Sequence, residues 1–458
     1  MKKTLLAVSF ATCCLMLANP ASNLSAQENQ IPAADNTPAV TQTQQTPQPE
    51  MAQNQAAASK KWTFMVFSNG DNNLDSDLVR DAQEMEKAGL SDDVNIIVQL
   101  DRENKPARRY SLTDRKAGAK ADDWGLTGNK VMELGEVDMG DYKQLVEFVK
   151  WSKENYPASK YMLVIENHGS GWKKKAQKAF RGISYDDQSG NHITTKDLGI
   201  AMEKIQQILG KPLDVFGMDA CLMQMMEVAY EVKDNVKFIS ASEEVEPGAG
   251  WPYDFVCPPL VQNPKLNGKE FVNIVVSAFG ESYKNETGAT QSAVDCSKLD
   301  DLANALDAFA ASVIESAGNA ADVKAFKWAV SKSQKFDEAD NVDIGNLMKN
   351  IQESAVNAKI KDAAVKVLMA YEKAVMQNSQ TGGSVSNATG MAIYIPTYGF
   401  NAKYATTKFA ALRWDEMIKS VYAKKDEANE SAAPAASPMP NSNPFMHGMD
   451  MPPMMKTN

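Results

Sequence analysis

Two short stretches of the sequence each end in a side chain that can do acid–base or nucleophilic chemistry. YMLVIENHG (residues 161–169) places His168 before a glycine, and LDVFGMDAC (residues 213–221) ends in Cys221. Both are apolar runs that stop abruptly, as a buried strand does where it leaves its sheet. Ligands bind at the carboxyl ends of strands in open α/β sheets. The two stretches therefore predict a nucleophilic pair, in which the imidazole exchanges a proton with the thiol.

The surroundings predicted for Cys221 favour its reactive form. A thiol with the ordinary pKa of about 8.5 is only a few per cent thiolate at neutral pH. We expect a helix to begin at Leu222, and its N-terminus, together with the imidazole of His168, to stabilise the thiolate. The backbone N–H groups of Gly169 and Cys221 are the candidate oxyanion donors. A glycine at this point lets the main chain approach a substrate closely.

The cysteine count points to the same thiol. Residues 1–26 have the charged start, short apolar core and small-residue exit of an export signal. Its removal leaves Cys221, Cys257 and Cys296, an odd number for an exported protein. Cys257 and Cys296 either form a disulfide or are buried separately as small apolar side chains. Cys221 is then the spare thiol, which argues against the alternative of an inert core cysteine.

Among three histidines, only His168 closes an apolar strand. His192 lies in a polar loop and His447 in the C-terminal tail, and no CxxC or HExxH spacing occurs, so we expect no metal site of the zinc type.

An acidic run follows the first predicted strand and contains Asp71, Asn73, Asp75 and Asp77. It lacks the glycine at the sixth position and the glutamate at the twelfth that an EF-hand needs. Capping of the following helix is the first interpretation, and a calcium site of another type is the alternative.

The composition is that of a soluble globular protein long enough for two domains, with 458 residues, 43% hydrophobic and 23% charged. The formal net charge is −10, and a chain with no basic face is not expected to bind nucleic acid. The apolar run of the signal is too short to span a bilayer, and no later stretch is long enough.

The pattern along the chain predicts an α/β fold. Apolar strands at 62–68, 93–101, 161–167 and 213–219 alternate with amphipathic helices, which indicates a mainly parallel sheet flanked by helices. A late strand at 390–397 either returns to this sheet or starts a small second one. We divide the chain into a signal peptide, a disordered tether, an α/β core, a mostly helical C-terminal domain and a disordered Met/Pro-rich tail: 1–26, 27–60, 61–297, 298–424 and 425–458.

Five motifs, taken in order, resemble the clostripain family of cysteine peptidases, which share the caspase–gingipain–legumain type of fold. They are FMVFSNGDNNLD, YMLVIENHGSGW, RGISYDD, GMDACLM and ASEEVEPGAGWPY. The resemblance covers roughly residues 61–300 and, more loosely, the helical remainder to about 422. The offset between His168 and Cys221 is similar to the His-to-Cys spacing of about 50 residues in caspases.

The resemblance implies that His168 and Cys221 form a catalytic dyad and that the enzyme cleaves after Arg or Lys, with acidic groups in the pocket for that side chain. Asp219 matches one such position. A second acid in some relatives lies in the PG-x-G turn, where this chain has Ala249, and we take Glu243 as its candidate substitute, with Glu244 and Glu246 nearby.

Many relatives cut their own chain between the histidine and cysteine segments. The basic loop KKKAQKAFRG follows Trp172, and we favour self-cleavage at Lys178, with Lys175 and Arg181 as alternatives. By itself this charge run is typical of a solvated loop.

The sequence thus predicts a secreted or periplasmic cysteine endopeptidase that acts on protein or peptide substrates. We expect a monomer, as a single or a processed two-chain form, that requires no cofactor; a calcium dependence like that of some clostripain-like enzymes stays open. The alternatives are an inactive caspase-fold binding protein and an acyl-transfer enzyme that uses the same dyad.

Overall fold

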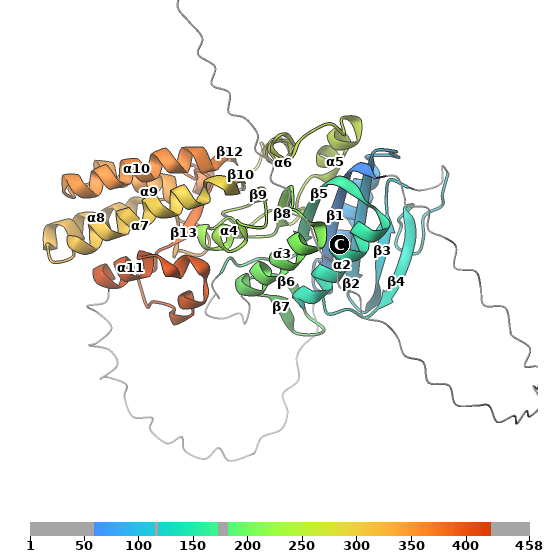
Figure 1. Ribbon diagram of the computed structural model, residues 1–458, viewed down its shortest axis with the longest axis horizontal. Helices are drawn as coiled ribbons and strands as arrows, with labels where there is room; N and C mark the ends of the chain where they lie inside the picture. Colours follow the sequence, from blue (N-terminus) through green and yellow to red (C-terminus); the bar gives the residue numbers. More distant parts are fainter. Residues whose placement is uncertain (1–58, 115–117, 173–181, 423–458) are drawn as a thin grey trace, which may run out of the picture. The chain divides into compact units, whose positions relative to one another are not determined.

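The computed structural model of the protein describes residues 59–114, 118–172 and 182–422 (Figure 1). Within them, a nine-stranded sheet has the order β12-β10-β9-β8-β5-β1-β2-β3-β4. The central strands, from β2 to β9, are parallel, and antiparallel pairs extend both edges. The strands are β1 (Lys60–Gly70), β2 (Val94–Arg102), β3 (Lys105–Ser111), β4 (Asn129–Gly135), β5 (Ala158–Glu166), β8 (Val215–Asp219), β9 (Phe238–Ala241), β10 (Thr290–Asp295) and β12 (Val375–Gln380).

Helices cover both faces of the sheet because its central strands are apolar on both sides. Along β1, Met65 and Phe67 join one hydrophobic cluster with residues of α2, α3 and α4, whereas Phe64 and Val66 join a second with residues of α1, α5 and α6. This alternation is the period of two expected of a strand. The helices are α1 (Asp75–Glu86), α2 (Tyr142–Asn155), α3 (Thr195–Leu209), α4 (Met226–Val232), α5 (Tyr253–Gln262) and α6 (Gly268–Ser282). A hairpin of β6 (Ile183–Asp186) and β7 (Asn191–Ile193) precedes α3.

The helical C-terminal part shares its core with the α/β part. Residues of its helices belong to the same hydrophobic cluster as those of α3 and α4, so the core continues across position 298. β12 joins the main sheet beside β10, whereas β13 (Ala392–Tyr394) pairs with β11 (Asn341–Asp343) in a separate two-stranded sheet. The late predicted strand therefore starts a second sheet. The helices are α7 (Leu299–Glu315), α8 (Ala320–Lys332), α9 (Ile344–Glu353), α10 (Ala358–Ala374) and α11 (Trp414–Tyr422).

The predicted α/β architecture with a mainly parallel sheet is confirmed. One local prediction is wrong, since the helix after Cys221 begins at Met226 and not at Leu222. Of the two arrangements left open for Cys257 and Cys296, the structure has the second: both are buried free thiols. No helix among the described residues has the length and apolar character needed to cross a bilayer.

Candidate active site

The strand order brings the histidine and cysteine segments together at one edge of the sheet. β5 and β8 are adjacent and parallel, and Glu166 lies opposite Asp219, the last residue of each strand. The next residue, Asn167, donates its backbone N–H to the carbonyl oxygen of Asp219 at 3.1 Å. His168 and Cys221 therefore leave the sheet side by side.

Gly169 sits against the main chain of Cys221. A Cβ atom on Gly169 would lie 2.4 Å from the carbonyl oxygen of Cys221 and 2.9 Å from Cγ of Met223. A side chain at this position would push the two segments apart, so the close approach of histidine and cysteine segments requires a glycine.

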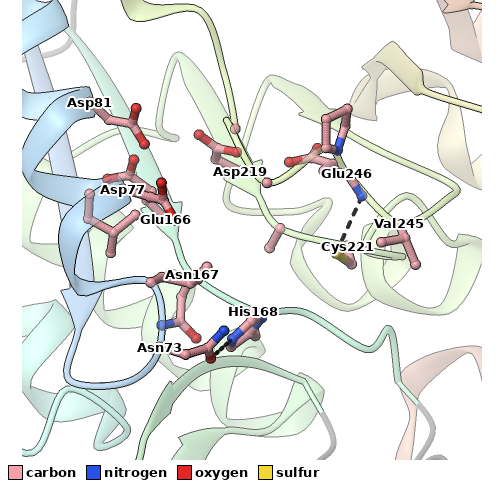
Figure 2. Close-up of a pocket in the computed structure, with 16 residues that line it drawn as sticks. Asn73, Asp77, Asp81, Glu166, Asn167, His168, Asp219, Cys221, Val245 and Glu246 are labelled. Carbon is pink, nitrogen blue, oxygen red and sulfur yellow. Dashed lines mark hydrogen bonds between the residues drawn. The ribbon is translucent and has the colours of Figure 1, made fainter. Parts of the chain in front are cut away.

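His168 is oriented by Asn73, a residue that follows a third strand of the sheet. Its Nε2 lies 2.8 Å from Oδ1 of Asn73, which is in the turn after β1 (Figure 2). An amide oxygen only accepts hydrogen bonds, so Nε2 carries the proton of the neutral ring and Nδ1 is its basic nitrogen. Sequence reasoning missed this role, because it treated Asn73 only as part of an acidic run. Its place at the carboxyl end of β1 was the available signal.

The Cys221 thiol lies in a turn rather than at a helix end. Leu222 has a left-handed backbone with φ +64°, and the following helix starts only at Met226. The helix N-terminus therefore does not act directly on the thiol. Burial raises the pKa of the Cys221 thiol, and the Asp219 carboxylate raises it further. The backbone N–H of Glu246, which donates to Sγ at 3.3 Å, lowers this pKa. The expectation that helix α4 stabilises a thiolate is wrong.

A cavity of about 290 Å³ joins these groups. Both His168 and Cys221 line it, together with buried carboxyl groups. No lysine or arginine is among its described lining residues. The buried carboxyl groups, which Figure 2 shows around the cavity and which we call the acidic cavity set, are those of Asp81, Glu166, Asp219 and Glu246.

The acidic cavity set consists of two carboxyl pairs. Asp81 lies within hydrogen-bond reach of Glu166, and Asp219 of Glu246. Among the described residues, no donor reaches Oε1 of Glu166 or Oε1 of Glu246. Burial raises the pKa of each of the four carboxyls, that of Asp81 to about 8. Arg80 pairs with Asp81 at 3.4 Å, but Glu166, Asp219 and Glu246 form no ion pair with a lysine or arginine among the described residues, although buried carboxylates normally need a positive charge.

Hydrogen bonds fix these carboxyls in place. The hydroxyl of Ser68 donates to Oε2 of Glu166 at 2.6 Å. The backbone N–H of Trp251 and the hydroxyl of Tyr253 both donate to Oδ2 of Asp219 at 3.0 Å. Two members of the acidic cavity set, Glu166 and Asp219, are thus held in place by neutral donors.

The predicted substrate-binding residues are not all at the cavity. Asp219 lines it, but Glu243 is buried elsewhere, where it accepts the backbone N–H of Gly390 at 2.9 Å and lies beside the Asp343 carboxyl. Glu243 therefore lies away from the cavity that holds Asp219. Glu246 lines the cavity instead, while Ala249 is exposed and outside its lining.

Asp81 and Glu166 were missed as cavity residues. Glu166 ends the strand that carries His168, which was a usable signal, whereas Asp81 comes from α1 and reaches the cavity only through the packing of that helix.

Two further predictions concern the acidic run after β1 and the self-cleavage residue. The acidic run after β1 does not form one site, since Asp75 pairs with Arg102 and Asp77 with Arg80, each at 2.7 Å. Lys178, the predicted self-cleavage residue, lies outside the described residues.

Comparisons of the chain with known proteins find a matching family model and a protein of similar sequence. The family model described as the clostripain family, Peptidase C11, matches residues 66–424. Clostripain from Hathewaya histolytica is 31% identical over 222 residues, and the match spans 43% of this chain but only 41% of that protein.

Two solved structures share the fold. A secreted C11 cysteine protease from Bacteroides thetaiotaomicron, in complex with an irreversible peptide inhibitor, has a TM-score of 0.58 and 19% identity, with 79% of this chain and 99% of that chain covered. An inactive zymogen C11 protease from Parabacteroides distasonis has a TM-score of 0.57 and 19% identity, with 80% and 99% covered. The thiol, the imidazole and the acidic cavity set thus lie on a fold that is already known from other proteins.

Proposed function

The chain belongs to the clostripain family of cysteine peptidases, and we propose that it is an endopeptidase that cleaves proteins or peptides after lysine or arginine. The observation that carries the proposal is the acidic cavity set. Four buried carboxyls, with no basic side chain among the described lining residues, share one cavity with the thiol and the imidazole. A cationic side chain of a substrate supplies the positive charge that three of them, Glu166, Asp219 and Glu246, lack.

The proposed reaction uses Cys221 and His168 as a dyad. Nδ1 of His168 takes the thiol proton while Sγ of Cys221 attacks the carbonyl carbon of the scissile bond. The N–H groups of Gly169 and Cys221 hold the oxyanion. The imidazolium then gives its proton to the leaving amine, and water hydrolyses the thioester to release the acid and regenerate the thiol.

The substrate itself assists the nucleophile in this scheme. Asp219 raises the pKa of the Cys221 thiol in the free protein. A lysine or arginine side chain beside Asp219 offsets that negative charge, so the thiolate forms at lower cost when a basic substrate is bound. Recognition and activation then depend on the same carboxylate.

Secretion and self-cleavage belong to the same proposal. The export signal at residues 1–26 supports secretion or transfer to the periplasm, as does the secreted relative. Self-cleavage at Lys178 is supported by the basic loop that starts directly after Trp172. Trp172, the last described residue before this stretch of sequence, is packed against Tyr394 and Tyr404 at ring distances of 4.7 and 5.0 Å.

The test compares residues 27–458 with the Cys221→Ala variant on fluorogenic peptides that end in Lys, Arg or Asp. We expect the wild type to hydrolyse the Lys and Arg peptides, to leave the Asp peptide intact and to cut its own chain. The variant should hydrolyse none of the three peptides and should not cut its own chain. Equal behaviour of the two proteins on every peptide rejects the proposed function.

A further inference from the structure

A group of hydrogen bonds ties the segment after His168 to the start of β6. The backbone N–H of Ser170 donates to the carbonyl oxygen of Gly182 at 3.0 Å, and the hydroxyl of Tyr185 donates to the same oxygen at 3.1 Å. The hydroxyl oxygens of Ser170 and Tyr185 lie 2.7 Å apart. A phenol has one proton, and that of Tyr185 goes to Gly182, so the Ser170 hydroxyl is the donor of this third bond. We call Ser170, Gly182 and Tyr185 the hydroxyl clamp.

The hydroxyl clamp determines where the N–H of Gly169 points. Gly169 and Ile183 form an antiparallel bridge, and the bond from Ser170 to Gly182 flanks this pair. In that pattern the two paired residues do not bond to each other, so their own N–H groups point away from the opposite segment. The N–H of Gly169 therefore points away from β6, and it has no acceptor among the described residues. It is available to an oxygen of a substrate bound at Cys221.

Tyr185 is itself fixed by several contacts. It is only 4% exposed, and its ring stacks on that of His192 with the centroids 5.3 Å apart. Its backbone N–H donates to Oδ1 of Asn167 at 2.6 Å, and its carbonyl oxygen accepts from Nδ2 of Asn72 at 2.8 Å. Asn167 directly precedes His168, and Asn72 lies in the turn after β1. Tyr185 is thus joined to both segments that position the imidazole.

The residue before Tyr185 has an unusual backbone conformation. Ser184 has a φ of +61°, in the left-handed region that residues other than glycine rarely adopt. Its buried hydroxyl donates to the carbonyl oxygen of Met139 at 2.8 Å and accepts from the side-chain amide of Asn69 at 3.2 Å. Strained positions of this kind persist only where neighbouring contacts fix them, and they are frequent at active sites. The backbone that carries Tyr185 is therefore held by β1 and by the loop before α2.

The contacts of Tyr185 favour an indirect role. Tyr185 is not among the described residues that line the cavity of the acidic cavity set. Burial raises the pKa of its hydroxyl, so this group keeps its proton at neutral pH and does not act as an acid or a base. We propose that Tyr185 is a positioning residue for the oxyanion donor: through Ser170 and Gly182, its hydroxyl holds the N–H of Gly169 in the direction of the oxyanion. This role rests on the proposed function.

Two substitutions in residues 27–458 break the hydroxyl clamp from its two sides. Tyr185→Phe removes the hydroxyl and keeps the stacked ring, whereas Ser170→Ala removes the partner hydroxyl. Each should lower kcat on a lysine peptide by about tenfold with little change in KM, less than the loss of about 10²–10³-fold on removing an oxyanion donor, because the Gly169 N–H stays in the protein. The two residues act through one hydrogen bond, so the double variant should lose no more activity than the weaker single variant. Losses that multiply in the double variant overturn the clamp.

A peptide aldehyde that ends in lysine separates a positioning role from a merely structural one. Sγ of Cys221 adds to the aldehyde carbon, the thiol proton passes through His168 to the former carbonyl oxygen, and this oxygen occupies the oxyanion position. Alkylation of Cys221 by iodoacetamide displaces iodide and forms no oxyanion. We expect Tyr185→Phe to weaken aldehyde binding by the factor by which it lowers kcat/KM, and to leave the alkylation rate unchanged.

Tyr161→Phe is the matched control. Tyr161 is 3% exposed, and its hydroxyl accepts the backbone N–H of Ala158 at 2.9 Å, at the start of β5. This variant should keep wild-type kinetics and wild-type affinity for the aldehyde. Thermal melts show which variants are folded, and Ser170→Ala carries the same test if Tyr185→Phe does not fold.

Three results overturn the positioning role: a folded Tyr185→Phe enzyme with wild-type kcat, a lower kcat with unchanged aldehyde affinity, and an alkylation rate that falls as much as kcat. In each of them the active wild type leaves the proposed function standing. A wild type that hydrolyses no peptide refutes the proposed function, and the positioning role with it.

Discussion

The contact between Gly169 and the main chain of Cys221 makes a sharp prediction for Gly169→Ala. The new Cβ would start 2.4 Å from the carbonyl oxygen of Cys221, where ordinary van der Waals contact begins near 3.4 Å. This carbonyl oxygen belongs to the backbone and not to the end of a flexible side chain, so it cannot rotate away from the new methyl group. The histidine and cysteine segments must separate by about 1 Å.

A displacement of this size is costly for a reaction that depends on alignment. Misplacing a catalytic group by about 1 Å reduces the rate by about 10²-fold, which corresponds to about 2.7 kcal/mol in the activation barrier. Gly169 is not among the described residues that line the cavity of the acidic cavity set, so binding of a basic side chain should change less. We therefore expect the loss mainly in kcat.

The assay measures kcat and KM on a lysine peptide, with circular dichroism and a thermal melt to show that the variant is folded. Gly318→Ala is the control, because a Cβ on this exposed glycine would meet nothing within 4 Å and its φ is not positive. The control should keep wild-type kinetics. A folded Gly169→Ala enzyme within threefold of wild-type kcat refutes the reasoning.

Three further substitutions test the site. Asn73→Ala removes the bond that sets the tautomer of His168 and should lower kcat by up to about tenfold with little change in KM; an unchanged kcat excludes this role. Asp219→Asn should lower kcat/KM on lysine and arginine peptides by about tenfold, yet speed alkylation of Cys221 by iodoacetamide near neutral pH, because Asp219 raises the pKa of that thiol; slower alkylation contradicts the electrostatic argument. Burial raises the pKa of Asp81 from 3.8 to about 8. Between about pH 4 and pH 8 the folded protein therefore keeps a proton on Asp81 that the unfolded chain releases. As the pH rises through this window, Asp81 lowers the free energy of unfolding by an increasing amount. The melting temperature of Asp81→Asn minus that of the wild type should therefore grow across this window and level off above it, and a constant difference would show that Asp81 titrates normally.

The sheet and the placement of the two reactive groups were predictable from the sequence for a physical reason. Strands buried on both faces read as continuous apolar runs, and the carboxyl ends of parallel neighbours must meet at one edge. The polar residue that ends each run therefore had to lie near the other. This holds for His168 and Cys221, which leave β5 and β8 side by side.

The details around Cys221 were not predictable in the same way. The residues after it have good helical propensity, but Leu222 adopts positive φ and the chain makes a turn first, because the N–H of Leu222 bonds to the carbonyl of Glu244 at 3.1 Å. That contact comes from a loop far along the chain. The same loop brings in Glu246, so the choice between Glu243 and Glu246 depended on tertiary packing that spacing does not encode.

The most direct test of the central claim is covalent labelling with chloromethyl ketone peptides that end in lysine or in aspartate, followed by mass spectrometry of the digested protein. Residues 27–458 should react with the lysine reagent at Cys221, much faster than with the aspartate reagent, and His168→Ala should slow the labelling of Cys221 by the lysine reagent. Labelling at Cys257 or Cys296, or equal rates for the two reagents at Cys221, would contradict a basic-specific cysteine peptidase built on this dyad.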